Sequence, residues 1–151
     1  MNSPAVVSNR KAYHNFHIIE RIECGIGLVG CEVKSLRLGQ ASLAESFARI
    51  ENKEVWLYGA HIAPYEKTGS FAVDALRARK LLLRKRQIER LAGAVAQKGL
   101  TLIPLRIYFN KRGLAKIELA LARGKRLYDK RESIKRKETE REIRREMKKR
   151  G

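Results

Sequence analysis

The sequence predicts a mainly β fold with helices: a small antiparallel β-barrel, closed or nearly closed, followed by a basic C-terminal tail. Three features predict it. Short segments of alternating apolar and polar residues recur between turn-forming residues, one segment has helical spacing, and the last 29 residues contain few large apolar side chains. Such a tail cannot offset the entropy that is lost on folding. We therefore place the barrel domain at residues 1–123 and the tail at residues 124–151, with a β-sandwich as the alternative architecture.

A bent strand is predicted near the N-terminus. Residues 15–22 alternate imperfectly between apolar and polar side chains, and three glycines interrupt the segment that follows, up to Val33: Gly25, Gly27 and Gly30. Glycine inside a strand marks a bulge or a bend. Further along, Ser42 with Glu45 three positions later has the form of a weak capping box, so we predict a short helix over residues 42–47.

Two hairpins are predicted from paired runs of alternating residues. The paired runs and their turns are 47–51 and 54–63 about Asn52-Lys53, and 105–109 and 117–121 about residues 110–113. Strands joined by such short turns pair in the antiparallel sense. Pro104 cannot donate a hydrogen bond to a neighbouring strand, so we expect it at an edge or a bulge.

A loop, a cation-rich run and a helix lie between the two hairpins. No period survives over residues 67–74, which predicts a loop, whereas apolar residues recur at helical spacing over 88–95 until Gly99 ends the helix. The cation-rich run 77–86 between them either grips phosphates or forms a solvated helix face with an apolar plug of leucines. Short curved strands with one substantial helix are typical of the small OB-fold barrels that bind oligonucleotides.

Positive charge is spread over the whole chain. The sequence holds 34 Lys and Arg against 16 Asp and Glu, a net charge of +18. The last 29 residues contain 14 basic and 6 acidic residues, or +8, and the other 122 residues carry the remaining +10. Basic side chains bind phosphates by displacing counterions. A polyanion, first of all nucleic acid, is therefore the expected partner of both the domain and the tail.

The sequence shows no pattern typical of a membrane protein, a metal or cofactor site, or an enzyme. There is no run of about 18 apolar residues and no apolar N-terminal segment, so we expect a cytoplasmic protein without membrane contact. Cys24 and Cys31 lie seven residues apart outside any CxxC pattern, and the histidines lack zinc-site spacing. We expect reduced structural thiols, no metal and no cofactor. Because no nucleophile has a base at a telling spacing, we also expect no enzyme activity.

The end of the tail carries ion pairs at helical spacing. Glu140 and Arg144, like Glu146 and Arg150, are four residues apart with the acidic residue first. Each such pair contributes about 0.2–0.5 kcal/mol to a helix, too little to hold an isolated helix of this length in water. We therefore predict a tail that is disordered when free and helical on its partner.

Four separated motifs, in this order, resemble those of the SmpB family of bacterial SsrA-binding proteins. They are Asn9-Arg-Lys-Ala, Gly30-Cys-Glu-Val-Lys-Ser-Leu-Arg37, Arg77-Ala-Arg-Lys-Leu-Leu-Leu83 and Gly124-Lys-Arg-Leu-Tyr-Asp-Lys-Arg131. The resemblance implies an OB-fold barrel that binds the tRNA-like domain of transfer-messenger RNA (tmRNA). It also implies a tail that enters the decoding centre and the empty mRNA channel of a stalled ribosome. The implied function is trans-translation, in which the nascent chain is tagged and the ribosome rescued, with no bond change catalysed by the protein itself.

The resemblance assigns functional residues as well. Glu23, Leu82 and Lys116 match positions that the family uses for tmRNA binding. The full set of expected tmRNA contacts adds the N-terminal motif and cations of the run 77–86: Asn9, Glu23, Arg77, Arg79, Lys80, Leu82 and Lys116. The tail positions expected at the decoding centre are Gly124, Asp129, Lys130, Arg131, Lys135, Arg136 and Lys137.

Two alternatives stay open on the residues alone. A general basic RNA-binding or ribosomal protein would have the same charge and strand pattern, and an RNA-modifying or RNA-cleaving enzyme would turn over excess RNA. We expect a monomer. Aromatic side chains near cations are candidates for stacking on bases: Tyr13, Phe16, Tyr65, Phe71 and Tyr108.

Overall fold

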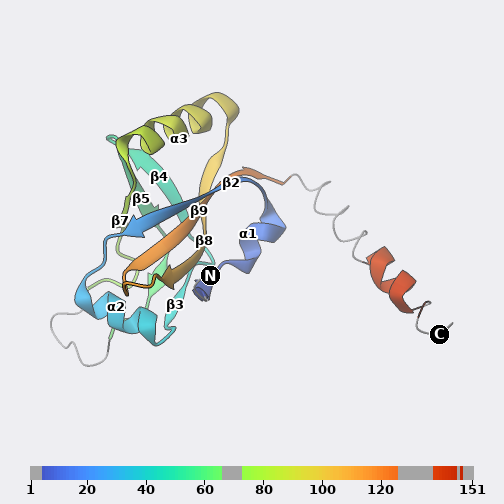
Figure 1. The fold of residues 1–151 in the computed structure, drawn as a ribbon, viewed down its shortest axis with the longest axis horizontal. Coiled ribbons are helices and arrows are strands. Elements are labelled where there is room, and N and C mark those ends of the chain that lie inside the picture. The colour runs from blue at the N-terminus through green and yellow to red at the C-terminus, as the bar shows by residue number, and fades with distance from the viewer. Residues whose placement is uncertain (1–4, 66–72, 126–137, 146, 148–151) are drawn as a thin grey trace.

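The computed structural model describes residues 5–65, 73–125, 138–145 and 147. Its main sheet consists of β1 (Ala5–Ser8), β2 (Phe16–Ile26), β4 (Phe47–Glu51), β5 (Glu54–Tyr58), β7 (Arg79–Leu82), β8 (Thr101–Phe109) and β9 (Ala115–Gly124). The strands follow the order β1-β8-β4-β5-β7-β2-β9, and β8 also pairs with β9. This last pairing closes six strands into a ring, with β1 attached to β8 (Figure 1). The predicted closed antiparallel barrel is thereby confirmed.

Helices cover the barrel, and a small second sheet accompanies it. These elements are α1 (Arg10–Asn15), α2 (Gly30–Arg37), α3 (Lys85–Lys98), and β3 (Ala41–Ser42) paired with β6 (His61–Ile62). α2 and α3 lie at opposite ends of the barrel (Figure 1). Leu36 of α2 and Leu91 of α3 are fully buried in the main core. The two helices therefore shield both ends of the core from solvent.

The main core lies inside the ring. β2 and β9 pair along nearly their whole length, from Phe16 opposite Gly124 to Gly25 opposite Lys116. Successive side chains of a strand point to opposite faces. Apolar residues of one parity on these two strands point inward and are buried: Ile22, Cys24, Ile26, Ile117, Leu119 and Leu121. The other parity, which includes Lys116, forms the outer face of the barrel.

The turns that the sequence predicts are confirmed. β4 and β5 form a hairpin whose turn residues Asn52 and Lys53 have positive φ angles of 49° and 63°, as a two-residue hairpin turn requires. Gly99 ends α3 in the left-handed conformation, with φ at 63°. In the β8–β9 hairpin the register shifts between Pro104 and Arg106, so the expected bulge lies at the proline.

The bent strand is present over Phe16–Ile26, with a shift of register between Ile18 and Glu20. It does not continue to Val33, however, because the chain leaves the sheet among the glycines and α2 begins at Gly30. Neither α1 nor α2 was predicted from the sequence. These helices have six and eight residues, which is too short for an apolar period to stand out.

The short helix predicted over residues 42–47 is wrong. Ser42 belongs to β3, and a turn separates it from β4. The Ser42 hydroxyl accepts a hydrogen bond from Ala44 N at 3.3 Å, and the Ser46 hydroxyl donates one to Leu43 O at 2.6 Å. Local bonds of this kind between a serine and the backbone stabilise a turn in place of a helix.

The helical interpretation of the cation-rich run is also wrong. Arg79–Leu82 forms strand β7, and α3 begins only at Lys85. Within β7 the side chains alternate, since Arg79 and Leu81 are buried whereas Lys80 and Leu82 are exposed. One inward residue of this strand is an arginine, so a search for apolar residues could not reveal the period.

The two cysteines differ in their surroundings. Both are free thiols; Cys24 is buried inside the ring, and Cys31, on α2, is partly exposed. Burial above all, and then the nearby Glu23 carboxylate, raises the pKa of the Cys24 thiol to about 12.

Because the thiolate is the reactive form, we expect a thiol reagent at about pH 8 to label Cys31 in the native protein and Cys24 only in denaturant. Rapid labelling of a native Cys31→Ser variant would contradict this.

Lys125, which directly follows β9, is bonded to α1. Beyond Gly124, the last residue of β9, Lys125 N donates to Asn15 O at 2.8 Å, and Lys125 Nζ donates to Tyr13 O at 3.3 Å. Residues 138–145 are helical and their side chains are exposed. The tail positions that lie outside the described residues are Asp129, Lys130, Arg131, Lys135, Arg136 and Lys137.

Candidate nucleic-acid interface

Four residues from four strands line up across the outer face of the barrel. Gly25 on β2 pairs with Leu82 on β7 at one side and with Lys116 on β9 at the other. Lys116 in turn pairs with Tyr108 on β8. Residues paired across antiparallel strands point to the same face, and Glu23 shares that face because it precedes Gly25 by two positions. Strand register thus gathers residues that are far apart in the sequence.

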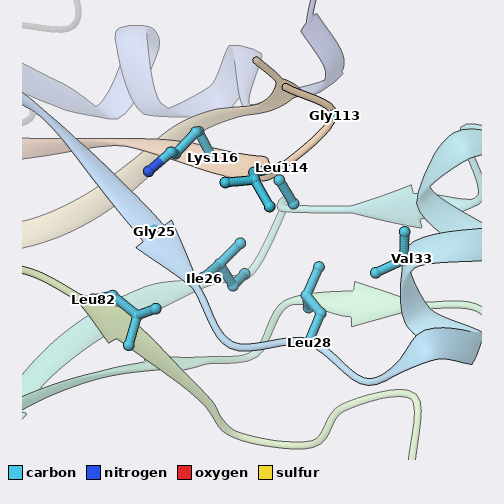
Figure 2. A pocket seen from close by; sticks show the side chains of 9 residues that line it. Gly25, Ile26, Leu28, Val33, Leu82, Gly113, Leu114 and Lys116 are labelled. Atoms are coloured by element: carbon cyan, nitrogen blue, oxygen red, sulfur yellow. The ribbon is translucent and has the colours of Figure 1, made fainter. Parts of the chain in front are cut away.

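The surface is hollowed beside this row (Figure 2). A cavity of about 260 Å³ lies between the end of β2, α2 and the turn that joins β8 to β9. Leu82 and Leu114 line it and are 54% and 55% exposed. Lys116 lines its edge, with the ammonium group directed away from Leu114 (Figure 2). A Cβ atom at Gly25 would lie only 3.1 Å from Leu82 Cβ, so glycine lets Leu82 pack closely against β2. An apolar hollow beside an ammonium group suits a base or ribose and its neighbouring phosphate.

A polar network lies on the same face. The Tyr108 hydroxyl donates a hydrogen bond to the Glu23 carboxylate. Arg106 Nε donates to Glu118 Oε2 at 3.3 Å, and the Arg106 guanidinium carbon lies 4.4 Å from the centre of the Tyr108 ring. Burial first, and then the bond to Glu23, raises the pKa of the Tyr108 phenol above its ordinary value. Tyr108 therefore remains a hydrogen-bond donor throughout the neutral range.

A buried ion cluster joins α2 to β7. Glu32 and Arg79 are 2% and 0% exposed. Glu32 Oε2 accepts a hydrogen bond from Arg79 Nε at 2.7 Å, and Glu32 Oε1 accepts one from Arg77 Nη2 at 2.5 Å. Val29 N donates to Glu32 Oε1 as well, at 3.0 Å. Burial by itself raises the pKa of Glu32, but the bonds from Arg77, Val29 N and Arg79 outweigh it and hold the pKa below its ordinary value.

The Arg79 guanidinium also binds the backbone at two further points, one just before β6 and one in the segment that leads into β7. Its Nη1 donates to Ala60 O at 2.7 Å, and its Nη2 donates to Ala75 O at 3.0 Å. Ala75 O accepts from Ile62 N at 3.0 Å too. The buried arginine thus positions β7, and with it the outward side chains of Lys80 and Leu82.

Comparison with known proteins decides the family of the chain. The model of the family described as SmpB protein matches residues 6–149. The chain belongs to the SmpB family. Among its relatives, the SsrA-binding protein of Caldicellulosiruptor bescii is 61% identical over 143 residues, which cover 95% of this chain and 90% of that protein. The SsrA-binding protein of Carboxydothermus hydrogenoformans is 56% identical over 91% of this chain and 92% of its own length.

A solved structure supports the same assignment. A chain from the structure described as "tmRNA-SmpB: a journey to the center of the bacterial ribosome" is 53% identical to this one. The match has a TM-score of 0.68 and covers 84% of this chain and 92% of that chain. The family resemblance inferred from the four sequence motifs is therefore confirmed, and so is the barrel.

Some of the residues predicted to contact tmRNA are exposed on the outer face, and others are buried or partly buried. Leu82 and Lys80 are exposed on β7, Glu23 is exposed on β2, and Lys116 lies at the rim of the hollow. Lys80 Nζ also pairs with Glu54 Oε2 at 2.9 Å. These side chains belong to the outer face, where a nucleic acid can reach them.

Asn9, Arg77 and Arg79 lie in other surroundings. Asn9 is 4% exposed and donates from Nδ2 to Pro104 O at 2.9 Å. The side chain of Arg77 is 33% exposed and that of Arg79 is fully buried, and both are bound to Glu32. Asn9 and Arg79 thus support the fold from within, and their roles in RNA binding stay predictions.

Several residues of this face were not predicted in the places that the structure gives them. Tyr108 was one of five candidates for stacking on a base, but it is 5% exposed and its hydroxyl is bound to Glu23. Gly25 was expected only to mark a bend in its strand, and Leu114 was not singled out, because their importance for this face depends on which strands are neighbours. One sequence feature could have indicated that Leu114 is exposed: it directly follows Gly113 in a turn, and turns commonly lie at the surface.

Over the ranges 5–65, 73–125, 138–145 and 147, no group of three or more His, Cys, Asp or Glu residues could hold a metal ion. Within the same ranges, no helix has the length and apolar character needed to cross a membrane.

Proposed function

We propose that this protein binds the tRNA-like domain of tmRNA with the outer face of its barrel and delivers it to stalled ribosomes. Its tail would occupy the decoding centre and the mRNA channel, so that the nascent chain is tagged and the ribosome is rescued in the cytoplasm. The protein changes no covalent bond in this scheme; it binds and positions RNA. Membership of the SmpB family and the names of its relatives support the proposal.

The observation that carries the placement of the interface is the cross-strand row. Pairing of Gly25 with both Leu82 and Lys116 brings two family positions to one surface, beside a hollow. Lys116 contributes charge for a phosphate, and Leu82 contributes an exposed apolar surface for a base or ribose. Glu23 lies on the same face, so all three positions can contact one RNA segment.

The test is a binding titration against the tRNA-like domain and an unrelated structured RNA, at two salt concentrations. The full chain is compared with a chain that ends at residue 125, which keeps the contacts of Lys125 with α1. We expect both proteins to prefer the tRNA-like domain with similar affinity, because the proposed interface is the outer face of the barrel, which both proteins contain. Equal binding of both RNAs with a steep salt slope would favour a general basic RNA-binding protein instead.

A further inference from the structure

Glu23 is an unexpected group on an RNA-binding face. It is an exposed carboxylate on a chain with a net charge of +18, and a carboxylate repels phosphates. An ionised carboxylate can only accept hydrogen bonds. The RNA groups that complement it are the N–H donors of base edges, as in the amino groups of cytosine and guanine, and the 2′-hydroxyl. Glu23 therefore suits contact with a base edge or ribose rather than with the phosphate backbone.

The neighbours of Glu23 on this face include a second carboxylate and a phenol that donates to it. Glu23 pairs across the strands with Glu118, and like charges directly opposite each other repel. Arg106 forms an ion pair with Glu118, with 3.3 Å between Arg106 Nε and Glu118 Oε2. Glu23 instead accepts a hydrogen bond from the phenol of Tyr108, which is neutral and so leaves the negative charge in place.

Tyr108 is a rigid donor for this purpose. The residue is 5% exposed, and the Arg106 guanidinium lies over its ring with 4.4 Å between the guanidinium carbon and the ring centre. A side chain that is already fixed costs less entropy when a ligand binds. A carboxylate offers about four lone-pair sites, so the bond from Tyr108 leaves capacity for an incoming donor.

We propose that Tyr108 is a positioning residue that holds the Glu23 carboxylate as a fixed acceptor for N–H donors on an exposed base edge of the bound RNA. This inference rests on the proposed function. Tyr108 then contributes to the preference for one RNA over another, because it acts through a contact with a base and not through phosphates.

The test is a double-mutant cycle of Tyr108→Phe and Glu23→Ala in the full chain. Affinity is measured for the tRNA-like domain and for an unrelated structured RNA, at a temperature where the circular dichroism of all variants coincides with that of the parent. We expect Tyr108→Phe to weaken binding of the tRNA-like domain about tenfold, the size of a lost hydrogen bond to a charged group. In the E23A background the same change should have no effect beyond about twofold. Affinity for the unrelated RNA and the salt slope should not change.

Tyr58 provides the matched control. Its hydroxyl donates to Glu51 Oε2 at 2.8 Å, so Tyr58→Phe also removes a bond between a tyrosine and a carboxylate, on β5 and away from the hollow. We expect this variant to bind both RNAs like the parent.

The outcomes separate the inference from the function on which it rests. An equal loss from Tyr108→Phe with and without Glu23 would mean that Tyr108 only supports the fold, and the inference would be overturned while the function stands. A Glu23→Ala variant with full affinity would overturn it in the same way. If the parent protein itself does not prefer the tRNA-like domain, the proposed function fails, and the inference fails with it.

Discussion

Replacing Arg79 with methionine is expected to lower the free energy of unfolding by about 3 kcal/mol. Arg79 and Glu32 are 0% and 2% exposed and are bound to each other at 2.7 Å. Methionine fills most of the volume but leaves part of the buried charge of Glu32 without a partner, and it leaves the carbonyl oxygens of Ala60 and Ala75 without this donor. Urea unfolding followed by circular dichroism measures the loss.

Lys80 is the matched control for this change. It is the next residue on β7, but its side chain is 49% exposed, and its ion pair with Glu54 lies at the surface. We expect Lys80→Met to lower the free energy of unfolding by less than about 1 kcal/mol, as is usual for exposed pairs. Equal losses from the two substitutions would show that the buried cluster has no special role in stability.

The stability cost of Arg79→Met should depend on pH. The pKa of Glu32 is held below its ordinary value in the folded chain. Its contribution to stability is therefore complete above the ordinary carboxyl range and is lost as the pH falls through the lowered value. The difference in the free energy of unfolding between the parent and Arg79→Met should be large at neutral pH and should shrink in acid. Urea unfolding at several pH values measures it.

Replacing Asp129, Lys130 and Arg131 together with alanine is expected to abolish tagging while the affinity for the tRNA-like domain stays within about twofold of the parent. The reason is the division of charge: the three residues carry a net +1 in the tail, whereas the first 122 residues keep their own +10. Tagging is measured in a translation reaction on an mRNA without a stop codon, and affinity by titration of the RNA.

A second triple variant controls for lost tail charge. Glu146, Lys148 and Lys149 also carry a net +1 and lie nearer the end of the chain. We expect their replacement by alanine to reduce tagging far less than the change at residues 129–131. A large loss of RNA affinity in the first variant would instead mean that the tail takes part in holding tmRNA, and the proposed division of labour would be wrong.

The sequence predicted those parts of the fold that local chemistry determines. Asn52-Lys53, Gly99 and Pro104 each signal a turn, a helix end or a bulge through their own backbone preferences, and all three signals were right. Strand β7 was missed because one of its two inward residues, Arg79, is charged. An arginine can be buried there only because Glu32 lies opposite it, 47 positions away in the sequence, and no local pattern can reveal such a partner.

The candidate site was predictable as separate residues but not as a surface. Family motifs supplied Glu23, Leu82 and Lys116 one at a time, whereas their proximity follows from the pairing of three strands. The bond between Tyr108 and Glu23 joins residues 85 positions apart. Because a shift of one residue in register would turn these side chains to the other face, the site depends on long-range pairing that composition and periodicity do not encode.

The closure of the ring has a consequence for how the chain folds. The last strand, β9, pairs with β2 near the beginning and also with β8, so the ring cannot close until residues up to Gly124 have been synthesised. Contacts between such distant parts of a chain carry a large loop-closure entropy and make folding slow, roughly milliseconds to seconds for barrels of this kind. A nascent chain that lacks β9 would expose the unpaired edges of β2 and β8, which are sites for aggregation. The barrel therefore cannot complete its folding before β9 has been synthesised.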